Sequence, residues 1–348
     1  WLVEMLKKMQ FTMKNLARGC ASDFVQVKGS TSDLRRATDD NIAQFALLGL
    51  QILWSVDNQE SLEICRAKKT AMKECNQRQM EVLREMSSWC LQELGSKVNR
   101  RKIETMVTIH VHQKDVTNEL YVLNKSRKVQ DANDFEWLKQ ARFNWKPAAG
   151  DDVSNEGAAV ISITDVDFNY QYEYLGAKER LVITPLTDRC YITLAQALGM
   201  FFGGAPAGPA GTGKTETVKD LGRSLGIFVV VTNCTDQQSY KDCAKIFKGL
   251  CMSGLWGCFD EFNRIRLPVL SVVAQQVLSV LNAKKAGAQF FQFPGDPQQV
   301  NLIPACGFFI TMNPGYAGRQ ELPENLKALF RGVAMMVPDF QMIIKVKL

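Results

Sequence analysis

The stretch GPAGTGKT, residues 208–215, decides the fold class of this chain. It matches the phosphate-loop pattern G-x-x-x-x-G-K-[ST] at Gly208, Gly213, Lys214 and Thr215. Glycines let backbone N–H groups turn toward phosphate oxygens, and the helix that follows directs its positive end at them. The pattern predicts that Lys214 reaches the β- and γ-phosphates and that Thr215 offers its hydroxyl to Mg²⁺. We therefore expect an α/β nucleotide-binding domain.

The composition is that of an ordinary globular protein. The 348 residues are enough for two domains; 46% are hydrophobic and 22% charged, and the net charge is +6. The basic runs at 97–102 and 124–128 are typical of solvated helix faces, so we expect no nucleic-acid partner. No signal peptide and no apolar run near 20 residues is found, so we expect no membrane span. The first and last residues resemble no natural start or stop, which suggests a piece of a longer protein.

Cysteine and histidine usage argues against disulfides and zinc. The ten cysteines lack paired C-x-x-C spacing, and several lie in apolar runs, which predicts reduced, buried thiols in a reducing, cytoplasmic setting. The two histidines, His110 and His112, have no acidic or cysteine cluster around them, so a zinc site is not expected. The cysteines in apolar runs are Cys190, Cys234, Cys258 and Cys306.

Residues 1–150 are predicted to be mostly helical. Apolar residues recur near helical spacing over 61–94, which predicts one helix about 50 Å long at 1.5 Å per residue, with Gly95 as its C-terminal cap. Residues 100–116 place apolar side chains and His110 on one helical face, although their β-branched content leaves a strand open. Residues 133–145 predict an aromatic-rich amphipathic turn or two.

The second half has the alternation of an α/β domain. Two strands, paired with each other, are expected over 158–168 and 169–176, and Thr187 or Asp188 is a candidate N-cap for the helix that follows. Strands and helices then alternate with short connections, which predicts a parallel sheet wrapped by helices. The expected elements are helices at 214–225, 239–252 and 267–285 and strands at 227–234, 255–259 and 306–313.

Two further motifs would convert nucleotide binding into hydrolysis. In LWGCFDEF, an apolar strand ends in Asp260 and Glu261, so both carboxylates would lie at the edge of the sheet that carries the phosphate loop. Asp260 would hold Mg²⁺, and Glu261 would polarise the attacking water. In FFITMNPG, Asn313 would place a carboxamide beside the γ-phosphate; alone, it also fits a simple turn before proline.

Together these motifs resemble the Walker A, Walker B and sensor I motifs of an AAA+ ATPase. The words GPAGTGKTETVKDLG, CFDEFNRI, ITMNPGYAGR and LPENLKALFR resemble the first AAA+ module of a dynein heavy chain, and VHQKDV and YEYLG resemble the end of its linker. These sequence segments resemble those of axonemal dyneins, outer-arm chains among them, more than those of cytoplasmic dyneins. The resemblance implies an elongated, mostly helical linker or lever over residues 1–160 and the AAA+ large subdomain over 161–348.

The resemblance also implies roles for individual residues. Leu181, Val182 and Ile183 would contact adenine, while Arg331 would serve as an arginine finger for a neighbouring module's site. Catalysis would rest on Glu261, Asn313 and Lys214, with Thr215 and Asp260 at the metal. The nucleotide contacts carried over from the motif are Gly208, Pro209, Ala210, Gly211, Thr212, Gly213, Lys214, Thr215 and Glu216.

The implied ligands are ATP or ADP with Mg²⁺, and the implied activity is ATP hydrolysis that moves the linker for microtubule-based motility in a ciliary axoneme. Expected partners are the following AAA+ modules, a microtubule reached through a stalk outside this segment, and dynein intermediate and light chains. Two alternatives stay open. One is another AAA+ remodelling ATPase, which would not need the helical half; the other is a module that uses its nucleotide only structurally.

Overall fold

The computed structural model describes residues 1–27, 30–146, 157–313 and 321–337. The chain forms two compact units, Trp1–Thr184 and Pro185–Leu348. The paired strands that follow residue 157 pack in the first unit, whereas the sequence boundary was set at 160/161. The boundary at 160/161 separates the expected linker from the expected AAA+ large subdomain, and it stays a prediction.

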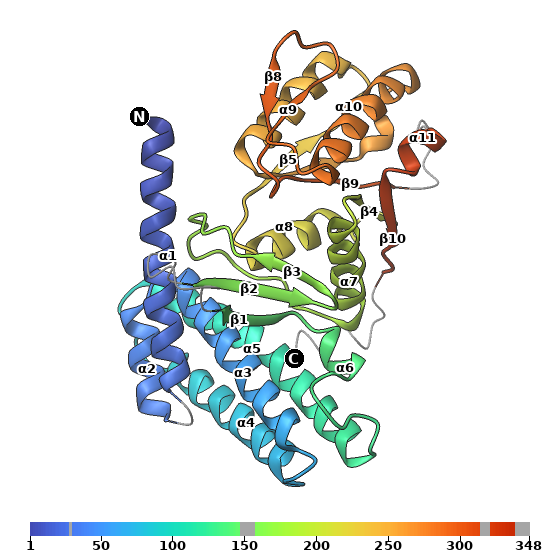
Figure 1. Cartoon of the computed structure of the whole chain (residues 1–348). Coiled ribbons are helices and arrows are strands. Elements are labelled where there is room, and N and C mark those ends of the chain that lie inside the picture. The colour runs from blue at the N-terminus through green and yellow to red at the C-terminus, as the bar shows by residue number, and fades with distance from the viewer. Residues whose placement is uncertain (28–29, 147–156, 314–320, 338–348) are drawn as a thin grey trace. The chain divides into compact units, whose positions relative to one another are not determined.

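The N-terminal unit is mostly helical, as predicted, and includes a small antiparallel sheet (Figure 1). Helix α3 contacts α1, α4 and α5, and the sheet, in the order β1-β2-β3, packs on α1 and α3. The elements are α1 (Leu2–Gln26), α2 (Thr31–Asp40), α3 (Ala43–Ile64), α4 (Ala71–Trp89), α5 (Lys97–Lys125), α6 (Phe135–Leu138), β1 (Arg142–Lys146), β2 (Ala158–Ile163) and β3 (Val166–Asn169).

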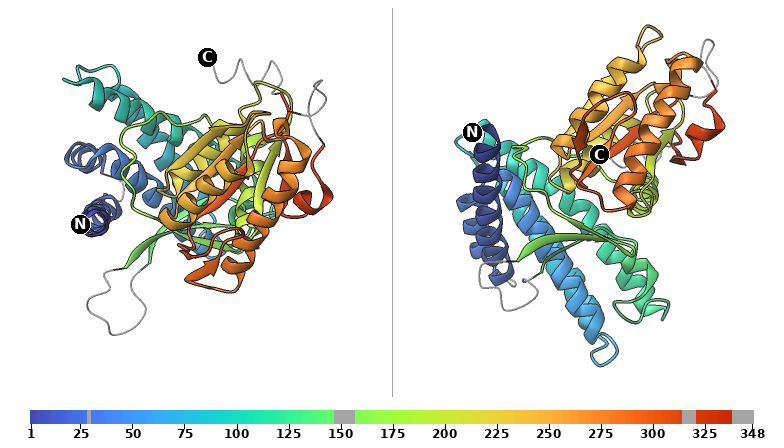
Figure 2. Two further views of the ribbon diagram at one scale, coloured as in Figure 1. Left: turned by 90° about the horizontal axis from the view of Figure 1, so that it is seen from above. Right: turned by 45° about the horizontal axis from the view of Figure 1, so that its top comes forward.

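The single long helix predicted over 61–94 is wrong. The chain leaves α3 after Ile64 and turns back into α4 at Ala71, so the two helices pack on each other (Figure 2). Residues 66–70 are exposed, while Leu62 and Met72 on either side of the turn are buried in one core. Folding back therefore buries the apolar faces of both helices, which one straight rod would leave open to water. The predicted cap at Gly95 is also wrong, because α4 ends at Trp89.

The stretch at 100–116 is helical, inside α5, and His110 is buried. Its Nε2 lies 3.1 Å from the backbone oxygen of Gln79. The turns predicted over 133–145 are confirmed only for α6, since the chain continues as strand β1 and pairs antiparallel with β2. That pairing joins Phe143 to Ile161, far along the chain, so helical periodicity could not indicate it.

The two strands expected over 158–168 and 169–176 have the wrong bounds, because the first segment alone forms the antiparallel pair of β2 and β3, with a turn at Thr164 and Asp165. Strand β3 ends at Asn169, and the segment 170–176 is not a strand. Two of its tyrosines are buried instead: Tyr170 Oη accepts a 2.8 Å hydrogen bond from Gln44 Nε2, and Tyr172 Oη accepts one of 2.8 Å from the backbone N–H of Ala159. Side-chain anchoring therefore replaces the strand pairing that the alternating pattern had indicated.

The C-terminal unit confirms the parallel sheet with flanking helices. Its strands run parallel in the order β10-β4-β9-β6-β5. The elements are α7 (Pro185–Gly199), β4 (Gly203–Ala207), α8 (Lys214–Ser224), β5 (Val229–Asn233), α9 (Tyr240–Ser253), β6 (Trp256–Asp260), a 3₁₀ turn (Phe262–Arg264), α10 (Leu267–Lys285), β7 (Phe290–Gln292), β8 (Gln299–Asn301), β9 (Gly307–Ile310), α11 (Glu324–Lys327) and β10 (Phe330–Ala334). Strands β7 and β8 form a separate antiparallel pair.

Helices cover both faces of this sheet (Figure 1). On one face α7 and α8 pack together, and on the other α9 and α10 do so. Phe247 of α9 stacks on Phe259 of β6 and Phe308 of β9, with ring centroids 4.9 and 5.3 Å apart. A sheet that is buried on both faces leaves its strand ends as the place for a polar site.

Two sequence expectations about this unit need correction. Thr187 and Asp188 do not cap α7, because the helix begins at Pro185 and both lie in its first turn. Among the described residues, one helix, α10, is long and apolar enough to cross a membrane, although the sequence analysis found no such run. The buried face of α10, which includes Leu270, Val273 and Val277, belongs to the core of the unit.

All ten cysteines are free thiols, and nine are buried, as predicted.

Candidate nucleotide-hydrolysis site

The phosphate loop joins the end of β4 to the start of α8. Gly211 and Gly213 have φ values of +78° and +79°, which side chains rarely adopt. At Gly208 a Cβ atom would lie 2.2 Å from the backbone oxygen of Met335, so only glycine fits there. These three glycines let the loop curl in front of the N-terminus of α8, where backbone N–H groups lack helical partners and favour an anion.

Lys214 is the first residue of α8 and is 7% exposed. Its Nζ donates hydrogen bonds to the backbone oxygens of Gly208 (3.0 Å) and Pro209 (2.6 Å), both in the loop. Burial lowers the pKa of Lys214, while Asp260 and Glu261 act in the opposite direction. The Lys214 ammonium contacts only neutral carbonyl oxygens here. Negatively charged phosphate oxygens would bind it more strongly than these carbonyls do, because both partners of the hydrogen bond would then carry charge.

Thr215 and Asp260 form the pair of oxygens expected at a metal. The Thr215 hydroxyl donates to Asp260 Oδ1 over 3.0 Å, and the Thr311 hydroxyl donates to the same oxygen. Two neighbouring ligands of an octahedral Mg²⁺, each 2.0–2.1 Å from the ion, lie about 3 Å apart. Hydroxyl and carboxylate oxygens are also the hard donors that Mg²⁺ prefers, so this pair fits the ion.

Glu261 follows β6 in a strained conformation. Its φ of +53° and ψ of +43° lie in the left-handed region, which is uncommon for a residue with a side chain. Its backbone N–H donates to the Thr311 hydroxyl over 3.0 Å, and the N–H of Phe262 donates to the backbone oxygen of Thr311 over 3.0 Å. Thr311, which directly follows β9, therefore holds the backbone turn at Glu261 and also contacts the Asp260 carboxylate.

The Glu261 carboxylate contacts two other side chains. Asn313 Nδ2 donates to Glu261 Oε1 over 3.2 Å, and Arg264 Nε lies 2.8 Å from Oε2. Asn313 is 7% exposed, and within the described part of the chain its Oδ1 has no hydrogen-bond partner. A buried carbonyl oxygen without a partner is costly, so this oxygen fits an acceptor for a ligand or a water.

The strand order explains why these residues meet. Strand β9 lies between β4 and β6, so the residue that follows β9 reaches the same sheet edge as the phosphate loop and the Asp260–Glu261 turn. A bridge between Ala207 and Met312 extends the pairing of β4 and β9 to the residue before Asn313. The structure therefore brings together Lys214, Thr215, Asp260, Glu261 and Asn313, as the three motifs predicted.

The sequence analysis missed Thr311 and Arg264. Thr311 touches both Asp260 and Glu261, and Arg264 pairs with Glu261. Spacing could have indicated Thr311, because it lies two residues before Asn313 on an extended segment, and alternate residues of a strand share a face. Nothing in the sequence pattern singles out Arg264, since its pairing depends on the 3₁₀ turn after Glu261.

The predicted adenine contacts lie in a different unit of the chain from the phosphate loop. Leu181, Val182 and Ile183 lie in a segment before α7 that is neither helix nor strand, and they belong to the N-terminal unit. Arg331 is exposed on the edge strand β10, paired with Gly204 at the start of β4 rather than with its phosphate-loop end. The roles of these four residues stay predictions.

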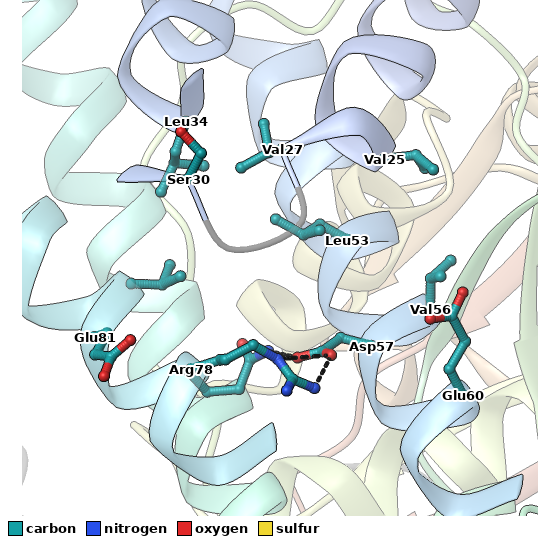
Figure 3. A pocket seen from close by; sticks show the side chains of 12 residues that line it. Val25, Val27, Ser30, Leu34, Leu53, Val56, Asp57, Glu60, Arg78 and Glu81 are labelled. Carbon is teal, nitrogen blue, oxygen red and sulfur yellow. Dashed lines mark hydrogen bonds and ion pairs between the residues drawn. The ribbon is translucent and has the colours of Figure 1, made fainter. Parts of the chain in front are cut away.

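A separate cavity of about 430 Å³ lies in the N-terminal unit and contains none of the predicted site residues (Figure 3). Valine and leucine side chains line it together with Asp57 and Arg78, which form an ion pair, and Gln79 Nε2 donates to Asp57 Oδ2 over 2.6 Å. This carboxylate already accepts from both Arg78 and Gln79.

The comparisons with known proteins agree with the geometry of the phosphate-loop site. Residues 170–348 match the family described as the hydrolytic ATP binding site of dynein motor region. The chain is 53% identical over its whole length to dynein axonemal heavy chain 8 of Homo sapiens and 51% identical to the flagellar outer-arm dynein gamma chain of Chlamydomonas reinhardtii. It is 50% identical over 310 residues, 89% of the chain, to the ciliary dynein beta chain of Tripneustes gratilla.

The chain spans 7% of the length of each of these three relatives. The family match includes the phosphate-loop site, and the identities to the first two relatives extend over the whole of this chain. The chain therefore belongs to the dynein heavy chain family and carries that family's ATP-binding motor region.

Proposed function

We propose that this chain hydrolyses ATP at the phosphate-loop site as the first AAA+ module of an axonemal dynein heavy chain. The observation that carries the proposal is the contact between Asn313 Nδ2 and Glu261 Oε1 at the sheet edge that carries the phosphate loop. A pocket that only stores nucleotide needs the loop and Lys214. It has no need of a strained carboxylate that is hydrogen-bonded to a buried amide.

Binding would be carried by the loop and the first turn of α8. The N–H groups of residues 208–215 and the Lys214 ammonium would bind the phosphates, and Thr215 and Asp260 would hold Mg²⁺. When bound, the ion would neutralise charge on the β- and γ-phosphates. Leu181, Val182 and Ile183 are proposed to contact adenine, and Glu216 to lie beside the phosphates at the start of α8.

Chemistry would be carried by two side chains. Glu261 is proposed to accept a proton from the attacking water, and Asn313 to orient that water through its amide. The turn held by Thr311 would keep the base separate from Asp260, which leaves one carboxylate for the metal and one for the proton. Arg331 is proposed to act on the site of a neighbouring module, and the site described here would receive its arginine finger from the following module.

At the level of the whole protein, we propose that hydrolysis moves the helical N-terminal part as a lever and so drives microtubule-based ciliary beating. The axonemal, flagellar and ciliary relatives support a location in the axoneme. The proposed partners are the following AAA+ modules, a microtubule reached through a stalk outside this segment, and dynein intermediate and light chains. Neither nucleic acid nor membrane is a proposed partner.

Equilibrium binding tests the nucleotide part of this proposal. Fluorescence anisotropy with a fluorescent ATP analogue, with and without Mg²⁺, should show that Lys214→Ala weakens binding by about 100-fold or more, because a buried charged donor is lost. Lys241→Ala, an exposed lysine on α9, is the control and should bind like wild type. Equal affinities for the wild type and Lys214→Ala would contradict the proposed phosphate site.

A further inference from the structure

The proposed general base already has a donor on each of its carboxylate oxygens. Oε1 accepts from Asn313, and Oε2 pairs with Arg264 Nε at 2.8 Å. A base must present an oxygen lone pair to water at about 2.6–3.2 Å. The Arg264 guanidinium, paired with Oε2, competes with water for this carboxylate oxygen.

The local backbone leaves only the side chain free to change this arrangement. Arg264 ends the 3₁₀ turn, and its N–H donates to the backbone oxygen of Glu261 over 3.0 Å. On the other side, Thr311 receives the Glu261 N–H. Rotation of the carboxylate away from the guanidinium therefore needs no change in the strand or the turn.

The Arg264 pairing is also weak enough to be broken during turnover. The side chain of Arg264 is 48% exposed and that of Glu261 28% exposed, so water and salt screen their attraction. An exposed ion pair of this kind contributes little to stability, so the carboxylate can leave the guanidinium by thermal motion.

We propose that Arg264 is a positioning residue that holds Glu261 in a resting orientation, so that hydrolysis requires the carboxylate to leave the guanidinium. This inference rests on the proposed function, because it assigns Glu261 the role of base. The ion pair lowers the rate of hydrolysis and does not contribute to nucleotide binding. Its removal should therefore change the rate of hydrolysis and leave nucleotide affinity unchanged.

The test is single-turnover ATP hydrolysis by the full heavy chain, with Mg²⁺ and saturating enzyme, for wild type, Arg264→Gln and Arg264→Lys. Arg264→Gln should hydrolyse bound ATP about two- to fivefold faster, which is the range that a partly exposed ion pair supplies. Arg264→Lys keeps the charge and should stay close to wild type. The difference between wild type and Arg264→Gln should shrink as salt rises from about 50 to 500 mM, because screening loosens the wild-type pair.

Two controls separate this role from a general structural effect. Arg266→Gln removes an exposed arginine two residues away and should match wild type. In a Glu261→Gln background, Arg264→Gln should have no effect on the rate. Arg264→Gln that is slower than or equal to wild type, or whose nucleotide affinity changes as much as its rate, overturns the role of Arg264 alone. A wild-type chain as inactive as Glu261→Gln contradicts the proposed function itself.

Discussion

The Thr215 hydroxyl and the Asp260 carboxylate, 45 residues apart in sequence, lie 3.0 Å apart in the structure. This hydrogen bond joins the first turn of α8 to the end of β6. Thr311, which directly follows β9, donates to the same carboxylate oxygen. The separation matches that of two neighbouring ligands around Mg²⁺.

Asp260→Asn should weaken Mg²⁺-dependent ATP binding by about 10- to 100-fold, because the neutral amide replaces a charged metal ligand. Binding of the analogue in EDTA should change little, since Lys214 and the loop remain. Titration of Mg²⁺ at fixed nucleotide measures the effect. An unchanged Mg²⁺ midpoint in Asp260→Asn would remove this carboxylate from the metal site.

Asn313→Ala should lower the single-turnover rate by about 100-fold, because one positioned donor at a reacting centre is lost. ATP affinity should stay within about twofold, since Asn313 contacts Glu261 rather than the loop. Asn301→Ala, an exposed asparagine on β8, is the matched control. A parallel loss of affinity and rate would show that Asn313 supports the fold of the pocket instead.

Gly208→Ala should weaken ATP binding by at least about tenfold and lower the melting temperature, because the new Cβ would lie 2.2 Å from the Met335 backbone oxygen. The control is Gly249→Ala in α9, where nothing lies within 4 Å of the added Cβ. It should keep ATP binding and stabilise the protein by about 0.5–1 kcal/mol, because alanine favours a helix interior. Equal behaviour of the two variants would refute the steric argument.

The order of strands and motifs along the chain explains which parts of the site were predictable. Phosphate loops and strand-end carboxylates are local patterns, so Lys214, Asp260 and Asn313 could be placed at a common sheet edge from sequence. Arg264 could not be found in this way, because its contact with Glu261 depends on a left-handed turn. The backbone N–H of Glu261 in this turn is bound by Thr311, which lies 50 residues further along the chain.

The fold shows the same division between local and distant causes. Helix α10 has the predicted bounds, since its apolar periodicity and flanking residues lie within one segment. The break between α3 and α4 was missed because no glycine or proline marks residues 65–70, and only the packing of the two helices requires the turn. Strand β1 was missed because its partner β2 lies beyond residue 157.

Acid should destabilise the N-terminal unit through His110. Burial lowers the pKa of His110 to about 4, whereas a histidine in an unfolded chain has a pKa near 6.5. Between these values the unfolded state binds a proton that the folded state excludes, so stability is full above about pH 6.5 and is lost as pH falls toward 4. The contribution of this group should fall by about 2 kcal/mol between pH 7 and pH 5.

Urea unfolding followed by tryptophan fluorescence at pH 7 and pH 5 measures this loss. His110→Gln should remove most of it, because glutamine carries no titrating proton. His112→Gln, the other histidine of the chain and only two residues away, should keep the wild-type pH dependence. The same dependence in wild type and His110→Gln would show that other groups cause the acid sensitivity.

The most direct test of the central claim is single-turnover ATP hydrolysis by a chain extended through the following module, with wild type, Glu261→Gln and the surface control Glu324→Gln. We expect wild type and Glu324→Gln to hydrolyse bound ATP, and Glu261→Gln to bind ATP with similar affinity while hydrolysing it at least 100-fold more slowly, the lower end of what a general base contributes. Equal turnover in wild type and Glu261→Gln, with nucleotide bound to both, would contradict Glu261 as the base and leave a pocket in which ATP is only a structural ligand.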